Sequence, residues 1–563
     1  MANDYKTPGV YVEEIPKFPP SVAGVATAIP AFIGYTDKTP DKEIIPRRIS
    51  NLLEYEALFG FGPKLSVEIA TITKKNGAEE IKEVVANKSI KNSEYVLYDS
   101  IRLFYDNGGG VCYIVSVGQY GKAKTTPDEL KKESFLSGIT ALEKVDEVTL
   151  VLFPDAVNLK NDDELMAGVQ TAALKHCRKK RDRFAILDVK KGITKDDIGT
   201  FRQKISNEPH ELRYGAAYYP YLSTIYNKQW TLWDVKNYLG GFKAIGEENE
   251  ATLNTILTIK PATSLSPEDE AEINDLAIIT EEGKDKLKIG PKTEIAAAQK
   301  PMTEEDLKNK LKETNLSKEN KEKYGEMLKL LVDAKAAKSD ELVEKNKLRI
   351  NSIIPFIDGY EEAVKALNAK ATLIPPSGAI AGIYSATDQY RGVWKAPANV
   401  SIASISGLSD FITNDDQENM NIDAKSGKSV NAIRVFSGQG ILVWGARTLD
   451  GNSNEWRYVS VRRLFNYIEE SVQKSTLWAV FNPNDGNTWI KIKSQIENFL
   501  NNLWRIGALA GSTPDSSYYV KVGLGATMTA EEIQRGLLIV EIGLAAVRPA
   551  EFIVLRFSHK VQE

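Results

Sequence analysis

Short apolar runs alternate with amphipathic segments along the chain, and this pattern predicts a mixed α/β protein. Val148–Phe153 and Phe184–Asp188 are nearly continuous apolar runs, as in buried strands, and the apolar positions of Glu164–Lys179 between them recur at helical spacing. Strand, helix and strand at this separation predict a parallel βαβ unit. Further strands are expected at Val111–Val117 and Tyr214–Tyr219.

The final third of the chain is richer in helical patterns. Val459–Ser475 is amphipathic, and further helices are expected at Thr488–Gly507 and Met528–Gly536. In the last of these, Thr529 suits the N-cap position, and the two glutamates that follow suit the positive end of the helix dipole. A second strand-rich stretch is expected to resume at Leu373–Gly378.

A charged segment separates these two parts. Residues 301–350 contain 12 basic and 11 acidic residues with both signs interspersed. Leucines and methionines such as Leu307, Leu311 and Met327 recur near helical spacing. We expect an inserted helical hairpin or small bundle over roughly 223–371. Either a solvated helical face or a surface for a specific partner explains the charge.

Two terminal segments have the pattern of strands. Val10–Ile15 is β-branched and aromatic and is closed by Pro16, while Phe552–Phe557 is almost wholly apolar and follows Pro549. Each would span roughly 20 Å as a strand. Domain termini are normally polar and frayed. The pattern alone leaves two interpretations open: each segment edges its own sheet, or each is donated to a neighbouring subunit.

Composition bounds the class of protein. With 563 residues, of which 42% are hydrophobic and 26% charged, the chain is expected to be soluble and to form three or more domains. The net charge of -4 argues against a nucleic-acid partner. The apolar stretch 536–547 is too short for a bilayer, so no membrane segment is expected. The N-terminus does not resemble a signal peptide, so we expect assembly in the cytoplasm.

The sequence offers little catalytic chemistry. Cys112 and Cys177 lack metal-ligand spacing and are expected to be reduced and structural. His176, His210 and His559 lie outside any catalytic motif, and neither a nucleophile elbow nor a zinc helix occurs. We therefore expect no catalytic, metal-binding or cofactor-binding residues. The alternative is a subtilisin-fold or other α/β hydrolase that forms oligomers.

Glycine, proline, arginine and aromatic residues gather in short segments along the chain. These are Pro8–Glu14, Phe104–Gly109, Pro375–Gly378, Ala381–Tyr384, Arg391–Asn399, Val443–Leu449, Trp456–Val459, Val461–Leu464 and Arg548–Phe552. In this order, over nearly the whole chain, they resemble the contractile tail sheath family of phages and phage-tail-like injection systems. Residues 223–371 depart from the resemblance because they are longer and more charged.

The resemblance implies a multidomain fold of α/β and α+β parts. The expected parts are an extended N-terminal arm at 1–22, the N-terminal part of the sheath body at 23–120, a subtilisin-like α/β domain at 121–222 and 372–445, a surface-exposed helical insertion at 223–371, a C-terminal α+β core domain facing an inner tube at 446–549, and a C-terminal arm at 550–563. The description as subtilisin-like refers to fold and not to activity.

The resemblance also implies a function and partners. Hexameric rings of the protein would stack helically around an inner tube and contract to drive it through a target envelope. Baseplate, terminal cap and paralogous sheath proteins would be further partners, within a virion tail or injection particle. Tube-facing candidates are Glu531, Glu532 and Arg535. Strands donated between subunits would comprise Val10, Tyr11, Val12, Glu13, Glu14 and Ile15, and Phe552, Ile553, Val554, Leu555, Arg556 and Phe557. With these motifs, donation becomes the preferred interpretation of both terminal segments.

Overall fold

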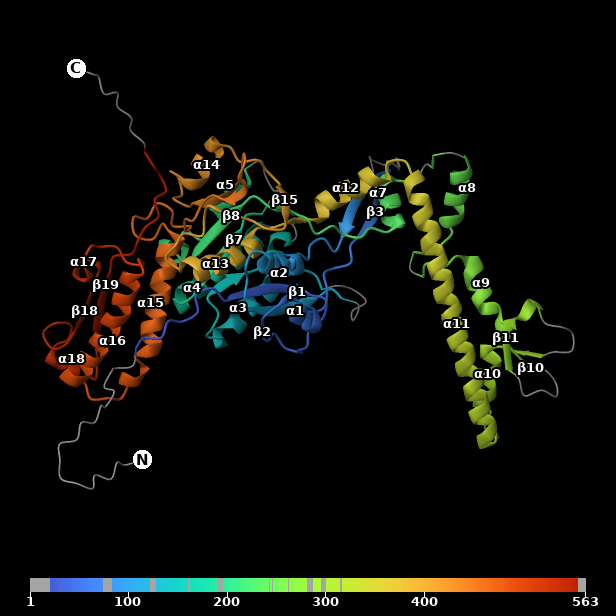
Figure 1. Ribbon diagram of the computed structural model, residues 1–563, viewed down its shortest axis with the longest axis horizontal. Coiled ribbons are helices and arrows are strands. Elements are labelled where there is room, and N and C mark those ends of the chain that lie inside the picture. The colour runs from blue at the N-terminus through green and yellow to red at the C-terminus, as the bar shows by residue number, and fades with distance from the viewer. Residues whose placement is uncertain are drawn as a thin grey trace, which may run out of the picture. The chain divides into compact units, whose positions relative to one another are not determined.

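The chain folds into two compact units, which Figure 1 shows as ribbons. The computed structural model describes residues 21–73, 84–121, 128–159, 163–190, 196–242, 244–245, 247–261, 263–280, 287–294, 300–313 and 316–554. The larger unit takes its residues from 1–64, 92–227 and 372–563, and the smaller from 65–91 and 228–371. The predicted strand Val10–Ile15 and the second half of the predicted strand Phe552–Phe557 lie outside the described residues.

A nine-stranded sheet organises the larger unit, in the order β14-β17-β16-β8-β7-β6-β1-β5-β2. The six strands from β16 to β5 run parallel, and β2, β17 and β14 pair antiparallel at the two ends. The strands are β14 (Val400–Ser401), β17 (Gly440–Val443), β16 (Val430–Phe436), β8 (Gly215–Tyr219), β7 (Phe184–Asp188), β6 (Leu150–Leu152), β1 (Pro30–Thr36), β5 (Cys112–Gln119) and β2 (Arg47–Ile49).

Helices cover both faces of this sheet, as parallel sheets require. Successive side chains of β1 enter different cores: Ile33 and Tyr35 pack with α3 (Lys132–Ala141) and α4 (Asp163–Lys180), whereas Phe32 packs with α1 (Leu52–Phe59), α2 (Leu97–Asp106) and α13 (Ser377–Arg391). Because both faces of the sheet are buried, the sequences of these strands are continuous apolar runs. The remaining helices of this region are α5 (Asp197–Lys204), α6 (Pro209–Leu212) and α14 (Asn414–Asn421). A small sheet of β13 (Leu373–Ile374), β9 (Leu222–Thr224) and β15 (Ile405–Leu408) adjoins them.

The predicted βαβ unit is confirmed as β6, α4 and β7. The prediction that Leu373–Gly378 forms a strand is wrong beyond Ile374, because helix α13 begins at Ser377. Gly378 explains why a helix fits here: a Cβ atom at this position would lie 2.3 Å from the Ser100 carbonyl oxygen in α2. Its missing side chain lets the two helices pack in close contact, which a periodicity search does not detect.

The C-terminal part of the larger unit is a layer of two helices and a two-stranded sheet. Helix α15 (Val459–Ser475) has the predicted bounds, and α16 (Gly486–Arg505) lies within two residues of its prediction. They share an apolar core with β18 (Tyr518–Val522) and β19 (Val540–Leu544). Short helices α17 (Pro514–Ser517) and α18 (Ala530–Gln534) flank the strands.

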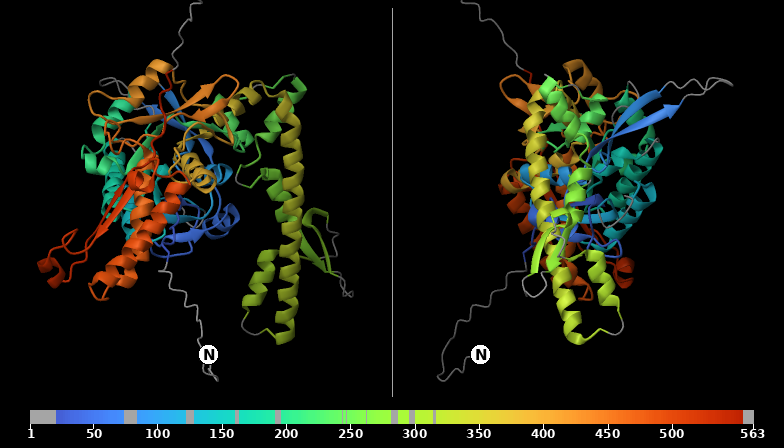
Figure 2. Two further views of the ribbon diagram at one scale, coloured as in Figure 1. Left: turned by 60° about the vertical axis from the view of Figure 1, so that its left-hand side comes forward. Right: turned by 90° about the vertical axis from the view of Figure 1, so that its right-hand side faces the viewer.

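The smaller unit is built around α11 (Lys318–Ile353), a helix of 36 residues. Figure 2 shows α10 (Glu304–Lys312) alongside one end of it. Leu307, Met327 and Leu331 form a small core with Ile278 of a three-stranded sheet that the sequence did not predict. The other elements are β3 (Ser66–Thr73), β4 (Val84–Lys91), α7 (Leu232–Leu239), α8 (Glu247–Ile256), α9 (Pro267–Asp275), β10 (Leu276–Thr280), β11 (Leu287–Pro291), β12 (Lys300–Met302) and α12 (Tyr360–Ala371). None of the helices described for either unit is both long and apolar enough to cross a bilayer.

Candidate assembly interface

Helix α15 anchors the chain where it enters the body from the N-terminal arm. Ser475 and Ser471 each accept a hydrogen bond at 3.2 Å through Oγ, from the backbone N–H groups of Ala23 and Val25. Arg463 donates to the Thr27 carbonyl at 2.9 Å. Val22 is buried in the core that α15 and α16 share. The N-terminal arm therefore starts from a fixed root, which we define as residues 22–29.

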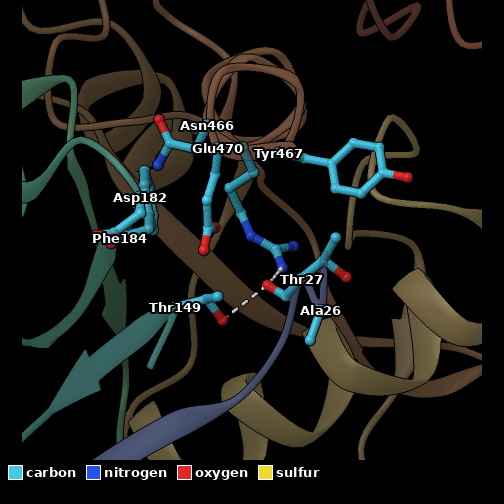
Figure 3. A pocket seen from close by; sticks show the side chains of 9 residues that line it. Ala26, Thr27, Thr149, Asp182, Phe184, Asn466, Tyr467 and Glu470 are labelled. Atoms are coloured by element: carbon cyan, nitrogen blue, oxygen red, sulfur yellow. Dashed lines mark hydrogen bonds between the residues drawn. The ribbon is translucent and has the colours of Figure 1, made fainter. Parts of the chain in front are cut away.

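A small polar cavity lies under this root (Figure 3). Thr149 donates to the Thr27 carbonyl at 2.9 Å and accepts from the Ile29 N–H at 2.8 Å. The cavity has about 10 Å³, the space of a single water molecule. Burial raises the pKa of Asp182 in its wall to about 6, and nearby Glu470 adds to the rise. The cavity is too small for a substrate, and we interpret it as part of the contact between α15 and the root at 22–29.

A buried ion pair joins α15 to α13 beside the N-terminal root. Arg463 donates to both carboxylate oxygens of Asp388, at 3.0 and 2.5 Å, and the two side chains are 3% and 5% exposed. The guanidinium also lies 4.7 Å from the ring centroid of Tyr384, whose hydroxyl is 2.8 Å from that of Tyr218. Arg463 thus ties the N-terminal root to the helix that packs on the central sheet.

A second anchor holds the root of the C-terminal arm. Arg447 donates to Glu551 at 2.9 Å through Nε and at 2.5 Å through an Nη, while the Asn421 amide and the Tyr458 hydroxyl donate to the same carboxylate at 2.9 and 3.2 Å. Arg447 is 3% exposed. Burial alone would raise the pKa of Glu551, but the hydrogen bonds from Arg447 and Asn421 bring it below its ordinary value.

The chain leaves this second anchor without a strand partner of its own. Phe552, Ile553 and Val554 are 69%, 80% and 76% exposed and have no strand assignment. A groove of about 940 Å³ lies beside the anchor and is lined partly by Phe552 and Glu418. Three consecutive large apolar side chains in solvent indicate an unfilled contact.

The sheet of β18 and β19 has two open edges within the described residues. Ala545 donates to the Ser517 carbonyl at 2.8 Å, and the register pairs Lys521 with Glu541. Because bonded and non-bonded pairs alternate in antiparallel strands, the N–H and C=O groups of Val540, Ile542 and Leu544 point to the outer edge of β19. An unpaired edge of this kind is a template for another strand.

A groove of about 650 Å³ runs beside the outer edge of β19, which we call the β19 groove. Phe465, Ile468 and Val472 of α15 line it together with Ile542 and Leu544 of β19. Its other lining residues include three cations and three carboxylates: Lys179, Lys180, Arg181, Asp182, Glu469 and Glu470. A strand laid on this edge would therefore meet apolar side chains and no net charge.

The candidate tube-facing residues belong to or follow the short helix α18. Glu531 and Arg535 are exposed. The Glu532 carboxylate accepts hydrogen bonds from the N–H and hydroxyl of Thr529 at 2.8 and 3.0 Å, which completes a capping box. These bonds lower the pKa of Glu532. Glu532 is thus engaged in holding the helix, while Glu531 and Arg535 present their charges to solvent.

The described residues do not assemble a hydrolytic triad. Ser377 donates to Asp188 at 2.6 Å, but His176 lies 2.8 Å from Arg183 instead. Burial and the Arg183 charge lower the pKa of His176 to about 4. Cys112 and Cys177 are free and buried, and no described cluster of three or more His, Cys, Asp or Glu could hold a metal ion. His559 lies outside the described residues.

The sequence motifs contained Arg447 and Glu551 but did not predict that they pair. The two residues are 104 positions apart. The available signal was that Arg447 is the single charged residue of Val443–Leu449 and Glu551 the single acidic residue of Arg548–Phe552. Both anchored arm roots and the outer edge of β19 involve α15: the N-terminal root bonds to Ser471 and Ser475, Glu551 bonds to the N-cap residue Tyr458, and the β19 groove is lined by residues between them.

Comparisons with known sequences point to one family. A family model described as the phage tail sheath C-terminal domain matches residues 452–560. The tail sheath proteins of Vibrio phage KVP40 and Enterobacteria phage T4 are 27% and 22% identical to this chain over 165 residues, which is 29% of its length. The matches cover 24% and 25% of those relatives, so the chain spans about a quarter of the curated relatives it matches.

Solved structures extend the likeness over the whole chain. The helical sheath of the anti-feeding prophage in the contracted state has a TM-score of 0.52 and 24% identity, covering 99% of this chain and 100% of that one. The contracted sheath complex of PVC, an extracellular contractile injection system, has a TM-score of 0.51 and 24% identity, covering 100% and 99%. The shared fold confirms the expected mixed α/β multidomain class.

Proposed function

We infer that this chain belongs to the contractile tail sheath family, because the model of the sheath C-terminal domain matches residues 452–560, and we propose that it is a structural subunit whose copies stack as hexameric rings around an inner tube. The rings shorten and widen, and so drive the tube through a target envelope. The observation that carries the proposal is the open edge of the β18 and β19 sheet, which lies inside the matched sheath domain, 452–560, between two anchored arm roots.

Subunits in such a stack are linked by strand addition. Residues 10–15 and 552–557 leave the body as arms and complete sheets of neighbouring copies, which satisfies backbone groups that an isolated chain leaves open. About five inter-strand hydrogen bonds at roughly 0.5 to 1.5 kcal/mol net each make such a link strong. The link survives movement because each arm starts from a fixed root.

Contraction then moves a stiff body on flexible arms. The central sheet is buried on both faces, so the body moves nearly rigidly and the conformational change falls on the arms. Because Glu551 is held by five hydrogen bonds from three residues, we expect bending beyond it.

The parts of the chain take separate roles in this proposal. Residues 121–222 with 372–445 form the subtilisin-like domain, and 446–549 face the tube, with Glu531 and Arg535 as contacts. The charged region 223–371 is a solvated outer surface or a partner site. The partners are other copies, the tube protein, baseplate and cap proteins, and paralogous sheath subunits, assembled in the bacterial cytoplasm. The protein is not an enzyme.

Truncation tests the proposal directly. We expect variants lacking residues 1–16 or 552–563 to remain folded and soluble, because both deletions leave the anchored roots intact, but to form no tubes. Negative-stain micrographs and sedimentation of the purified full chain and of both variants measure this. Striated tubes from the full chain and none from either variant are expected. Normal tubes from both variants would refute strand donation.

A further inference from the structure

We propose that the groove beside the C-terminal anchor is a docking site for a partner protein, which it binds through an acidic segment that carries an aromatic side chain. We call it the Trp394 groove; its lining includes Trp394, Lys395, Arg434, Trp444 and Arg548. Its volume of about 940 Å³ is at the upper end of the range for ligand pockets. This contact is separate from strand donation and does not depend on it.

The Trp394 groove is a positively charged site on an acidic protein. Its charged lining residues are four cations and two carboxylates: Arg391, Lys395, Arg434, Arg548, Glu418 and Glu551. The charge of Glu551 is already balanced by Arg447, which is not part of the lining. The whole chain has a net charge of -4, so the excess of positive charge is a local feature of the groove. A cleft lined by one sign of charge attracts ligands of the other sign.

Three of these cations are available to an incoming carboxylate. Arg391, Lys395 and Arg548 are exposed, and none of them forms an ion pair with any other described residue. They come from the end of α13, the loop that follows it and the segment after β19, so they converge on the groove from three parts of the chain. Clusters of this kind recognise acidic peptide motifs.

The fourth cation is held in position without being neutralised. The Arg434 guanidinium donates to the Ile412 carbonyl at 3.1 Å. It also donates to the side-chain oxygens of Gln417 and Asn414, at 2.6 and 2.9 Å. All three acceptors are uncharged, and an arginine has further N–H donors beyond these three. Arg434 is therefore oriented in advance while its charge remains for a ligand.

Aromatic rings form the apolar part of the groove, and they are also fixed in advance. The ring centroids of Trp444 and Phe436 are 4.4 Å apart, and Trp444 is 36% exposed. Trp394 packs on Gly392, where a Cβ atom would lie 2.3 Å from the indole ring. Because both indoles are already held by these contacts, a ligand loses little free energy in ordering them.

The lining favours a peptide over a nucleic acid. Carboxylates of a peptide pair with the cations, and an aromatic side chain packs against the indoles in an edge-to-face or offset arrangement. A nucleic-acid site commonly neutralises on the order of 6 to 10 phosphates, whereas this groove has four cations and also holds two carboxylates. A short acidic segment with one ring matches both the charge and the size of the site.

Fluorescence anisotropy with a labelled peptide tests the site on the full-length, unassembled protein. The probe is a glutamate-rich peptide with one central phenylalanine, and a second peptide has alanine in that place. Lys395→Glu combined with Arg548→Glu reverses two charges of the groove. Lys144→Glu combined with Lys491→Glu is the matched control, because both lysines are exposed, lie outside the groove lining and give the same change in net charge.

The expected result is saturable binding that depends on both the charges and the ring. We expect the affinity to fall by about tenfold or more in the groove variant and to stay unchanged in the control. The alanine peptide should bind the unaltered protein about tenfold more weakly than the phenylalanine peptide. Absence of binding, equal losses in both double variants, or equal affinities for the two peptides would each overturn the proposal.

Two further measurements test other occupants. A labelled single-stranded oligonucleotide with the net charge of the peptide should bind more weakly, and tighter binding would assign the groove to nucleic acid. Assembled tubes should carry the labelled peptide with them on sedimentation. Peptide that binds only unassembled protein would show that a second copy fills the groove, which would also overturn the proposal. Failure of the full chain to form tubes would count against the proposed function alone, because the anisotropy measurement does not require assembly.

Discussion

The buried pair of Arg463 and Asp388 should be one of the most sensitive points of the larger unit. Replacing Asp388 by Asn keeps one oxygen acceptor and the Thr27 carbonyl for the 3% exposed guanidinium, but it removes the paired charge and turns the second acceptor into an NH2 donor. Removing one partner of such a pair typically costs about 3 to 5 kcal/mol of unfolding free energy. We expect Asp388→Asn to lose that amount.

The adjacent arginine provides the matched control. Arg462 donates to Glu469 at 2.9 Å, but the Glu469 side chain is 44% exposed. Water screens such a pair, so Glu469→Gln should cost no more than about 1 kcal/mol. Both arginines lie on one helix and are 3% exposed, so the comparison isolates the burial of the carboxylate.

Denaturant unfolding of the unassembled protein, followed by fluorescence and circular dichroism, measures both changes. A third variant, Asp388→Leu with Arg463→Met, removes both charges and should recover a large part of the loss, because an apolar pair avoids the desolvation of ions. A loss below about 1 kcal/mol for Asp388→Asn, or equal losses for Asp388→Asn and Glu469→Gln, would refute the assignment of a buried, unscreened pair.

Further predictions concern pH, backbone packing and the tube. Burial raises the pKa of Asp188 to about 7, whereas an unfolded Asp has a pKa of about 4. Between these values the native state holds a proton that the unfolded chain has lost, so the free energy of unfolding falls as pH rises. Asp188→Asn should reduce this pH dependence in urea titrations at pH 5 to 8. Gly378→Ala should destabilise the larger unit by about 1 to 3 kcal/mol, because its Cβ would lie 2.3 Å from a carbonyl oxygen. Gly325→Ala, in open space on α11, should instead stabilise its helix by about 0.5 to 1 kcal/mol, so a calorimetric scan showing the same sign for both would contradict the packing argument. Exchanging the charges of Glu531 and Arg535 should lower co-sedimentation with the tube protein without changing the melting temperature, and unchanged recovery of tube would remove α18 from the interface.

Local elements followed closely from the chain pattern. The bounds of α15 are those that its amphipathic spacing predicts, and the βαβ unit around α4 follows from two apolar runs flanking a helix. Such features depend on residues within one or two turns of each other. For the same reason the pattern failed at Leu373–Gly378, where a close approach to Ser100 in another helix decides the conformation.

The sequence by itself determined the α/β class, most of the helices and, through the order of its motifs, the resemblance to tail sheaths. Only the tertiary structure decided that Arg447 meets Glu551, that the N-terminal root lies on α15, and that β19 has an open edge over apolar side chains. The physical reason is the separation along the sequence of the residues that interact. Periodicity reports which face of a segment is apolar, whereas ion pairs and sheet edges depend on which distant segments come together and which backbone groups then remain without a partner.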